Sequence, residues 1–497
     1  MKAKLHPSLK NTEFTLDDII FPPLKIPNFE WSDVDLSTKL TKNITLKMPL
    51  VSAPMDTVTE HKMAILLALF GGIGVIHYNF STIEDQIKEV EKVRRFEAGF
   101  VKNPVVLSKN NTVGDVFQKE EETGFLSYPI TEDGTLDSPM VGIITRHDIR
   151  YQEDLDKKLE AVMTPKDKLI VADKKKTLDK NDIKAANLIL RTNNIDILPI
   201  VDGKFHVVAL VTDRDLSLDK RYPLATKDGN KQLKVLVAVE SRLKLAQERI
   251  IRAKEAGASG VVIDARNIFG DHLEIAKWVK QNAPGLDVIL GNVVSADVVT
   301  LVMKQAGKYI DGFRVGIGGG EVCTTTESLG IGRSLANAIF EVDQALKVYR
   351  KKFGHLGIIA DGGIKSPHHI VGALMLGANA VMMGSMLAGL DESPIRAEYD
   401  PARGYMVKTV RGMGSAEVMR ERAGSNRYMV SNISPTERFP EGIKKVVAYK
   451  GSGADYLKML FAGVRQAMHG LGHKNLLELY RDGYIIPAQR ASSKGSL

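Results

Sequence analysis

Short, almost continuously apolar segments recur along the chain, each followed by a stretch with helical character. Strands that alternate apolar and polar residues have one face in water, whereas continuous apolar runs are typical of parallel strands buried on both faces. Eight such strands are predicted, over residues 50–55, 72–77, 234–240, 261–266, 287–294, 312–318, 357–363 and 380–385.

The segments between these strands carry apolar positions at helical spacing, clearest over residues 272–283 and 368–380. Most of the later strands begin about 25 residues apart, which is the length of one strand–helix unit. A doubly wound sheet would use about six strands. The count of eight therefore predicts an α/β fold of the (β/α)8 TIM-barrel class.

One interval, from residue 77 to residue 234, is too long for a single unit and predicts an inserted domain. It contains an internal repeat, in which residues 128–130 precede 141–149 and residues 198–200 precede 207–216. The predicted organisation is as follows: the first part of the barrel at 1–100, the insert at 101–222, and the remainder of the barrel, with the cysteine loop and a late flexible segment, at 223–497.

The repeat resembles a pair of CBS domains, which are α+β modules that often bind adenine or guanine nucleotides. The resemblance implies that the T-x-x-D turns, Thr145 with Asp148 and Thr212 with Asp215, lie near the ribose of a regulatory purine nucleotide. The alternative is that the pair serves only in packing or oligomerisation.

Composition narrows the setting of the protein. No run approaches the roughly 18 apolar residues of a membrane span, and no apolar stretch follows the basic start as in a signal peptide. A single cysteine excludes intramolecular disulfides and fits a reducing compartment, so a cytoplasmic location is expected. The net charge of +8 owes much to lysines between residues 157 and 184, which predict a solvated basic face rather than a site for polyanions.

Glycines follow the last two predicted strands, in Asp361-Gly362-Gly363 and in Gly384-Ser385. In a TIM barrel the loops after strands seven and eight often hold phosphate, and glycine lets backbone N–H groups approach an anion. The lone cysteine, Cys323, lies in a glycine-rich loop after strand six, at the same end of the barrel. A thiol placed there is a candidate nucleophile. The loop is not a dinucleotide fingerprint, because Glu321 stands where G-x-G-x-x-G requires glycine.

Several of these motifs together resemble IMP dehydrogenases, of the IMP dehydrogenase and GMP reductase superfamily. The matching motifs run in that family's order and cover nearly the whole chain: residues 52–60, 71–79, 221–233, 291–294, 314–325, 360–364, 382–385 and 411–415. Residues 426–428 and 440–443 resemble the mobile flap of IMP dehydrogenases, whereas GMP reductases generally lack the Arg-Tyr pair that Arg427 and Tyr428 form here.

The resemblance implies NAD-dependent oxidation of IMP to xanthosine 5′-monophosphate, in guanine nucleotide biosynthesis, through a covalent adduct on Cys323. It implies that Arg427 activates water, with Tyr428 beside it and with Thr325 and Glu441 assisting. The other implied contacts are purine and ribose at Asn292, Asp361, Met413 and Gly414, phosphate at Gly363, Gly384 and Ser385, cofactor at Asp264, Gly316 and Gly318, and potassium at carbonyls of Gly318, Gly320 and Cys323. His77 resembles a cofactor-side histidine, although a structural role is an equal alternative. The family forms tetramers that CBS pairs can join into octamers.

Several positions depart from the family's pattern, among them Ser334 and Leu335, where the family usually has Pro-Gln. Glu321 replaces a serine, and Val410 replaces a tyrosine, both of which bind the nucleotide phosphate in the family. Arg266 replaces a small residue and is expected either to contact a cofactor phosphate or to pair with Glu321. These changes leave two alternatives open: a GMP reductase or paralogue acting on another purine nucleotide or nucleoside, and a nucleotide-sensing scaffold.

Overall fold

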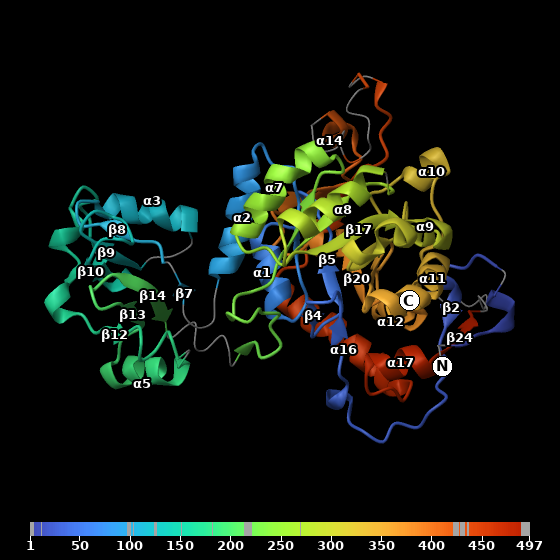
Figure 1. The fold of residues 1–497 in the computed structure, drawn as a ribbon, viewed down its shortest axis with the longest axis horizontal. Coiled ribbons are helices and arrows are strands. Elements are labelled where there is room, and N and C mark those ends of the chain that lie inside the picture. Colours follow the sequence, from blue (N-terminus) through green and yellow to red (C-terminus); the bar gives the residue numbers. More distant parts are fainter. Residues whose placement is uncertain are drawn as a thin grey trace. The chain divides into compact units, whose positions relative to one another are not determined.

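The structure is a computed structural model that describes the chain except residues 1–3, 11, 97–100, 103, 124–126, 151, 181, 213–220, 269, 421–426, 428–432, 435–436 and 489–497. The chain divides into two compact units (Figure 1). The first unit consists of Met1–Arg94, Leu224–Thr226 and Leu233–Leu497, and the second of Arg95–Pro223 and Lys227–Gln232.

The first unit contains a sheet of eight parallel strands in the order β5-β20-β19-β18-β17-β16-β15-β6. Their bounds are β5 Leu50–Ser52, β6 Val75–Ile76, β15 Leu236–Val239, β16 Gly260–Asp264, β17 Asp287–Val293, β18 Gly312–Val315, β19 Gly357–Asp361 and β20 Ala380–Met383. The ring closes beside β5, where Ile73 N donates to Leu50 O at 3.0 Å and Ser52 N donates to Ile73 O at 3.2 Å. The predicted (β/α)8 barrel is confirmed.

Alternate residues of the strands fill the barrel interior, as the two-residue period of a strand requires. Among the buried residues of this core are Val51, Val75, Leu236, Ala238, Val262, Ile289, Ile359, Ala380 and Met382. The other strand faces pack against helices, so both faces are apolar. This two-sided burial is the physical reason for the continuous apolar runs in the sequence.

Helices surround the strands (Figure 1). The longer ones are α1 His61–Leu69, α2 Ile83–Arg95, α7 Leu243–Glu255, α8 Gly270–Asn282, α9 Ala296–Ala306, α11 Leu335–Phe353, α12 Pro367–Leu376 and α16 Gly453–Gly470. The predicted helix over 368–380 is too long at its end. Helix α12 stops at Leu376 because Gly377 takes a φ of 120°, which side chains rarely adopt, and β20 begins at Ala380.

Smaller elements complete this unit. An antiparallel sheet forms from β21 Glu398–Asp400, β22 Tyr405–Arg411 and β23 Lys444–Ala448. Two further small sheets form from β1 Lys4–Leu5, β24 Tyr484–Pro487 and β2 Ile19–Ile20, and from β3 Thr38–Lys39 and β4 Thr45–Leu46. The short helices are α10 Thr325–Leu329, α13 Ser385–Ala388, α14 Ala416–Arg420 and α17 Leu476–Asp482. Among the described residues, no helix has the length and apolar character needed to cross a membrane.

The second unit has two four-stranded sheets, each with its own apolar cluster. One sheet contains β8 Leu107–Ser108, β9 Tyr128–Thr131, β10 Met140–Ile144 and β11 Thr164–Pro165, and the other β7 Val101–Lys102, β12 Ala172–Asp173, β13 Ile197–Val201 and β14 Val207–Thr212. Helices α3 Val113–Thr123, α4 Arg146–Ile149 and α5 Ile183–Asn193 accompany them. The internal repeat of the sequence corresponds to two antiparallel hairpins, β9–β10 and β13–β14.

The first T-x-x-D turn of this unit is a helix cap. Thr145 N and Thr145 Oγ1 both donate to Asp148 Oδ2, each at 2.7 Å, at the start of α4. In the second turn Thr212 ends β14, while Asp215 lies outside the described residues. A nucleotide at the first turn would share Asp148 with this cap, and the assignment of the unit as a CBS-domain pair stays a prediction.

Candidate active site

A cavity opens at the C-terminal ends of the barrel strands, which is where TIM-barrel enzymes place their active sites. It is lined by residues of β17 and β18 and of the loops after β5, β16, β18, β19 and β20, together with residues 412–414, Arg427 and Glu441. The residues predicted from the sequence that line it are Asn292, Gly316, Gly318, Gly320, Cys323, Thr325, Asp361, Gly363, Gly384, Ser385, Met413, Gly414, Arg427 and Glu441.

Two further predicted residues differ from that set. Asp264, at the end of β16, is fully buried behind the cavity wall and reaches the site only through its ion pairs. Tyr428 lies outside the described residues.

His77 is buried, stacks on Phe80 with ring centroids 4.1 Å apart, and accepts from Asn79 N at 3.0 Å. His77 Nε2 lies 3.8 Å from Glu60 Oε1 and has no hydrogen-bond partner among the described residues, so these contacts do not choose between the two readings of His77.

The cysteine loop is held by backbone contacts with the segment around Glu441. Thr324 N donates to Glu441 O and Ile443 N donates to Val322 O, each at 3.0 Å. The Cys323 thiol lies half-buried, 3.3 Å from Thr325 Oγ1, at the start of α10. The loop therefore presents the thiol to the cavity beside a hydroxyl that can donate to or accept from it.

Glycine is required in this loop for steric reasons. Gly316 and Gly318 have φ values of 132° and 78°, in the region that L side chains avoid. A Cβ on Gly316 would collide with the Asp361 carbonyl oxygen, and one on Gly318 would collide with the Thr326 hydroxyl. The loop after β18 can therefore pack directly on the loop after β19, which brings Cys323 and Asp361 into one cavity.

A buried arginine, Arg314, links two of the predicted carboxylates. Its guanidinium is only 5% exposed and donates to Asp264 Oδ1 at 2.5 Å and to Asp361 Oδ2 at 2.8 Å. Asn292 Nδ2 also donates to Asp361 Oδ2 at 2.8 Å and to Gly316 O at 2.5 Å. Arg314 was not among the predicted site residues, although a charged residue within an otherwise apolar strand signals a buried partner.

The late segment adds two more charged pairs. Arg427 pairs with Asp264, and Arg266 Nη1 donates to Glu441 Oε1 at 2.5 Å. The predicted pairing of Arg266 with Glu321 is wrong, because Glu321 Oε2 instead lies 3.2 Å from Lys445 Nζ. Glu441 is only 5% exposed, so a nearby cation is needed to offset its desolvation, and Arg266 supplies it.

The buried acceptor atoms of this region that have no hydrogen-bond partner among the described residues include Asn292 Oδ1, Asp264 Oδ2 and Glu441 Oε2. Buried polar atoms are normally satisfied, so these acceptors point to missing hydrogen-bond donors. A purine N–H suits Asn292, which lines the cavity, whereas Asp264 is fully buried by its pairs with Arg314 and Arg427 and is not open to a cofactor in this conformation. The residues that line the cavity therefore fit a purine nucleotide.

Titratable groups around Asp264 show where the negative charge lies. Burial raises the pKa of Tyr78 well above its ordinary value, and the charge of Asp264 adds to that rise. Burial lowers the pKa of His272 to about 4, with Asp264 acting in the opposite direction. His272 is therefore neutral at pH 7, so arginines, not histidine, supply the positive charge next to Asp264.

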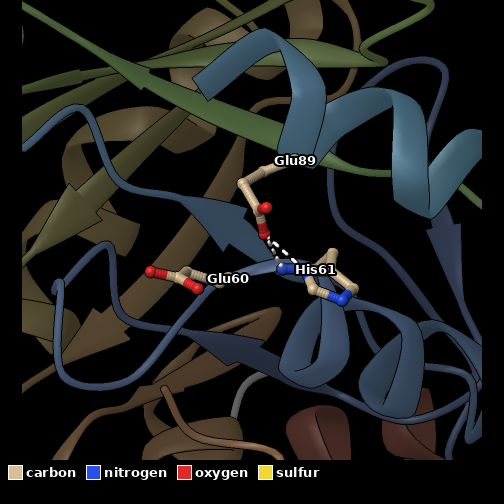
Figure 2. Close-up of side chains that lie close together, drawn as sticks. All are labelled: Glu60, His61 and Glu89. Atoms are coloured by element: carbon tan, nitrogen blue, oxygen red, sulfur yellow. Dashed lines mark hydrogen bonds and ion pairs between the residues drawn. The ribbon is translucent and has the colours of Figure 1, made fainter. Parts of the chain in front are cut away.

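Elsewhere in the first unit, Glu60, His61 and Glu89 lie close enough to suggest a metal site (Figure 2). Glu89 Oε2, however, accepts from His61 N at 2.8 Å and from His61 Nδ1 at 2.6 Å, and Glu89 Oε1 accepts from Lys92 Nζ at 2.8 Å. No dashed line joins Glu60 to the other two side chains in Figure 2. The cluster is thus better explained as an ion pair that fastens the first turn of α1 to α2.

The family resemblance predicts that carbonyls of the cysteine loop hold potassium. Hard cations take six or more oxygen ligands, whereas Gly318, Gly320 and Cys323 offer three, and Gly320 O already accepts from Cys323 N at 3.0 Å. Further oxygen ligands would have to come from elsewhere.

Comparison with known proteins agrees with this geometry. A family model described as the IMP dehydrogenase / GMP reductase domain matches residues 13–496. The chain is 40% identical over 475 residues to inosine-5′-monophosphate dehydrogenase of Schizosaccharomyces pombe, covering 94% of this chain and 86% of that protein. It is 42% identical over 441 residues to the enzyme of that name from Toxoplasma gondii, covering 88% and 76%.

Among solved structures, a GMP reductase variant from Trypanosoma brucei in complex with guanosine 5′-monophosphate has a TM-score of 0.85 and 28% sequence identity, covering 99% of each chain. The fold, the cysteine loop and these matches over nearly the full length lead to one conclusion: the chain belongs to the IMP dehydrogenase / GMP reductase family.

Proposed function

We propose that this protein is an NAD-dependent IMP dehydrogenase that forms xanthosine 5′-monophosphate, a step in guanine nucleotide biosynthesis. One observation carries the proposal: Cys323, Arg427 and Glu441 line the same cavity, beneath glycine loops suited to a phosphate. Relatives named inosine-5′-monophosphate dehydrogenase, at 38–42% identity, support the same activity.

In the proposed reaction the Cys323 thiolate adds to carbon 2 of the hypoxanthine ring. NAD, which the family resemblance places at Asp264, Gly316 and Gly318, would supply the acceptor for the hydride that leaves this carbon. The carbon–sulfur bond then persists as a thioimidate until water attacks the same carbon, releases the product and returns the thiol. Thr325 Oγ1, at 3.3 Å from Sγ, is placed to exchange a hydrogen bond with the sulfur throughout.

Hydrolysis requires a group that positions water and a group that accepts its proton. A free guanidinium stays charged at neutral pH, and pairing with Asp264 favours the charged form of Arg427. In this conformation Arg427 is therefore suited to orienting water, and the assisting role of Tyr428 is a prediction from the family resemblance alone. Glu441, whose Oε2 has no hydrogen-bond partner among the described residues, is the carboxylate suited to accepting the proton.

The remaining predicted contacts fit the same pose. Asn292 would receive a purine N–H, and Asp361 the ribose hydroxyls. Met413 and Gly414 would contact the purine ring, and Gly363, Gly384 and Ser385 the phosphate. Dependence on potassium, regulatory purine nucleotides at a CBS-domain pair, and a homotetramer or octamer remain predictions from the family resemblance.

A second function, reduction of GMP, is favoured by one observation: the solved structure with a TM-score of 0.85 is a GMP reductase. The test is absorbance at 340 nm. Formation of NADH from IMP and NAD, with and without potassium, would support the dehydrogenase. Consumption of NADPH with GMP, and no reaction with IMP, would support the reductase.

A further inference from the structure

The end of the cavity formed by the loops after β19 and β20 has unusual charges. Gly363, Gly384 and Ser385 line it, and loops in these positions hold phosphate in many TIM barrels. The cysteine loop reaches the same place, since a Cβ on Gly319 would lie 3.7 Å from the Gly362 carbonyl carbon. Two residues further along, the acidic side chain of Glu321 lines the cavity.

Two lysines of the late segment face this carboxylate. Lys445, on β23, places Nζ 3.2 Å from Glu321 Oε2. Lys450 donates from Nζ to Met386 O at 3.0 Å, next to Ser385. Burial lowers the pKa of Lys450, and the negative charge of Glu321 acts in the opposite direction, which places the two groups within electrostatic range. One carboxylate thus occupies a position where two cations could receive an anion.

The Glu321–Lys445 pair is suited to exchange. The two side chains are 24% and 46% exposed, and ion pairs so open to water contribute little net stability. A phosphate monoester carries up to two negative charges and three acceptor oxygens, so it competes well for an ammonium group. Glu321 would then lie beside the phosphate, where like charges repel.

We propose that Lys445 recognises the substrate's phosphate and that Glu321 is an internal competitor, which the phosphate must displace from Lys445. The inference rests on the proposed function, because it assumes that a purine nucleotide binds this cavity. The consequence concerns specificity. Because the phosphate must displace Glu321, it contributes less to binding than it would with the lysines alone, and the protein discriminates less sharply between a nucleotide and the matching nucleoside.

The test is calorimetric titration of the full chain with IMP and with inosine, in the absence of NAD. Glu321→Gln should tighten IMP binding about fivefold, and Lys445→Gln should weaken it about fivefold. Inosine, which lacks the phosphate, should bind each variant within about twofold of the parent protein. The gain in IMP affinity from Glu321→Gln should be smaller in a protein that already carries Lys445→Gln, because Glu321 then has no lysine at position 445 to compete for.

Lys444→Gln is the matched control, because Lys444 precedes Lys445 on β23 and pairs with Glu417 instead, at 2.6 Å. It should leave IMP binding unchanged. An IMP affinity that Lys445→Gln does not alter, or full additivity of the two substitutions, would overturn the inference while leaving the proposed function standing. Failure of the parent protein to bind either IMP or GMP would instead overturn the proposed function, and the inference with it.

Discussion

The two ends of the cavity differ in how they hold charge. At one end six charged side chains form close pairs, and none is more than 21% exposed: Asp264, Arg266, Arg314, Asp361, Arg427 and Glu441. At the other end glycine backbone predominates, and the ion pair between Glu321 and Lys445 is open to water. Breaking a buried pair is costly, whereas an exposed pair exchanges easily.

This difference separates two tasks. In the proposed reaction the buried end surrounds the atoms that react, where fixed charges stabilise a developing charge without having to reorganise. The open end receives the phosphate, which must enter and leave in every cycle. We therefore expect substitutions at the buried end to cause large losses of activity or stability. Substitutions at the open end should shift the affinity for substrate only modestly.

The largest effect is expected at Cys323, which lies between the two ends. Cys323→Ala removes the proposed nucleophile and should lower kcat for IMP oxidation by at least about 1000-fold. Binding of IMP without NAD should stay within about twofold of the parent protein, because the nucleotide contacts remain. Retention of more than a tenth of the activity would mean that no cysteine adduct is needed.

Arg314→Met tests the buried end for stability. The substitution leaves Asp264 and Asp361 without their shared guanidinium, and breaking a buried pair in this way costs about 3–5 kcal/mol. Urea unfolding measures the loss. Arg403→Met is the control, since Arg403 forms an exposed pair with Asp400 and its replacement should leave the free energy of unfolding unchanged. If Arg314→Met and Arg403→Met had the same free energy of unfolding, the buried pairs would stabilise the protein no more than an exposed pair does.

The buried pair of Glu89 and His61, outside the cavity, tests whether breaking a buried ion pair destabilises this protein in general. Burial by itself raises the pKa of Glu89, but hydrogen bonds and charge from His61 and the bond from Lys92 bring it down from 4.5 to about 2. A lowered carboxyl pKa stabilises the fold above the unfolded value and loses that contribution as pH falls from 4.5 towards 2. Glu89→Gln should therefore cost roughly 2–3 kcal/mol at pH 7, measured by urea unfolding, and the difference should shrink at pH 3. A constant difference would contradict this.

The smallest effect is expected at Arg266, the most exposed member of the buried end. Arg266→Met leaves Glu441 without its cation and should lower kcat about tenfold, with the KM for IMP nearly unchanged. Arg242→Met, which affects only a surface pair with Asp271, should change neither constant. A rise in KM alone would show that Arg266 acts in binding IMP rather than in positioning Glu441.

The barrel could be predicted from the sequence because two-sided burial leaves a local signal. Strands such as β17 are apolar almost throughout, and a residue's neighbours along the chain suffice to recognise them. The predicted end of α12 was too late in the sequence. The helix stops where Gly377 adopts a positive φ, and this backbone conformation cannot be recognised from the neighbouring residues. The glycine loops after β19 and β20 were predictable for the same local reason as the strands.

Side-chain pairing across the cavity could not be predicted in the same way. Arg314, Asp264 and Asp361 lie on three different strands, and only the closed barrel brings their side chains together. One of the two alternatives for Arg266 paired it with Glu321, but Glu321 pairs with Lys445 instead, because β22 and β23 bring the late segment to the cysteine loop. Such contacts depend on three-dimensional placement that sequence spacing does not encode.

The measurement that tests the central claim most directly is trapping of the covalent intermediate. The protein is mixed with IMP and NAD, quenched in acid and examined by mass spectrometry of the intact chain and of its peptides. Because the chain has a single cysteine, a thiol adduct can form only at Cys323. The account predicts a purine nucleotide adduct on the peptide carrying Cys323, absent without NAD and absent from Cys323→Ala. NADH formation with no adduct at any quench time would contradict it.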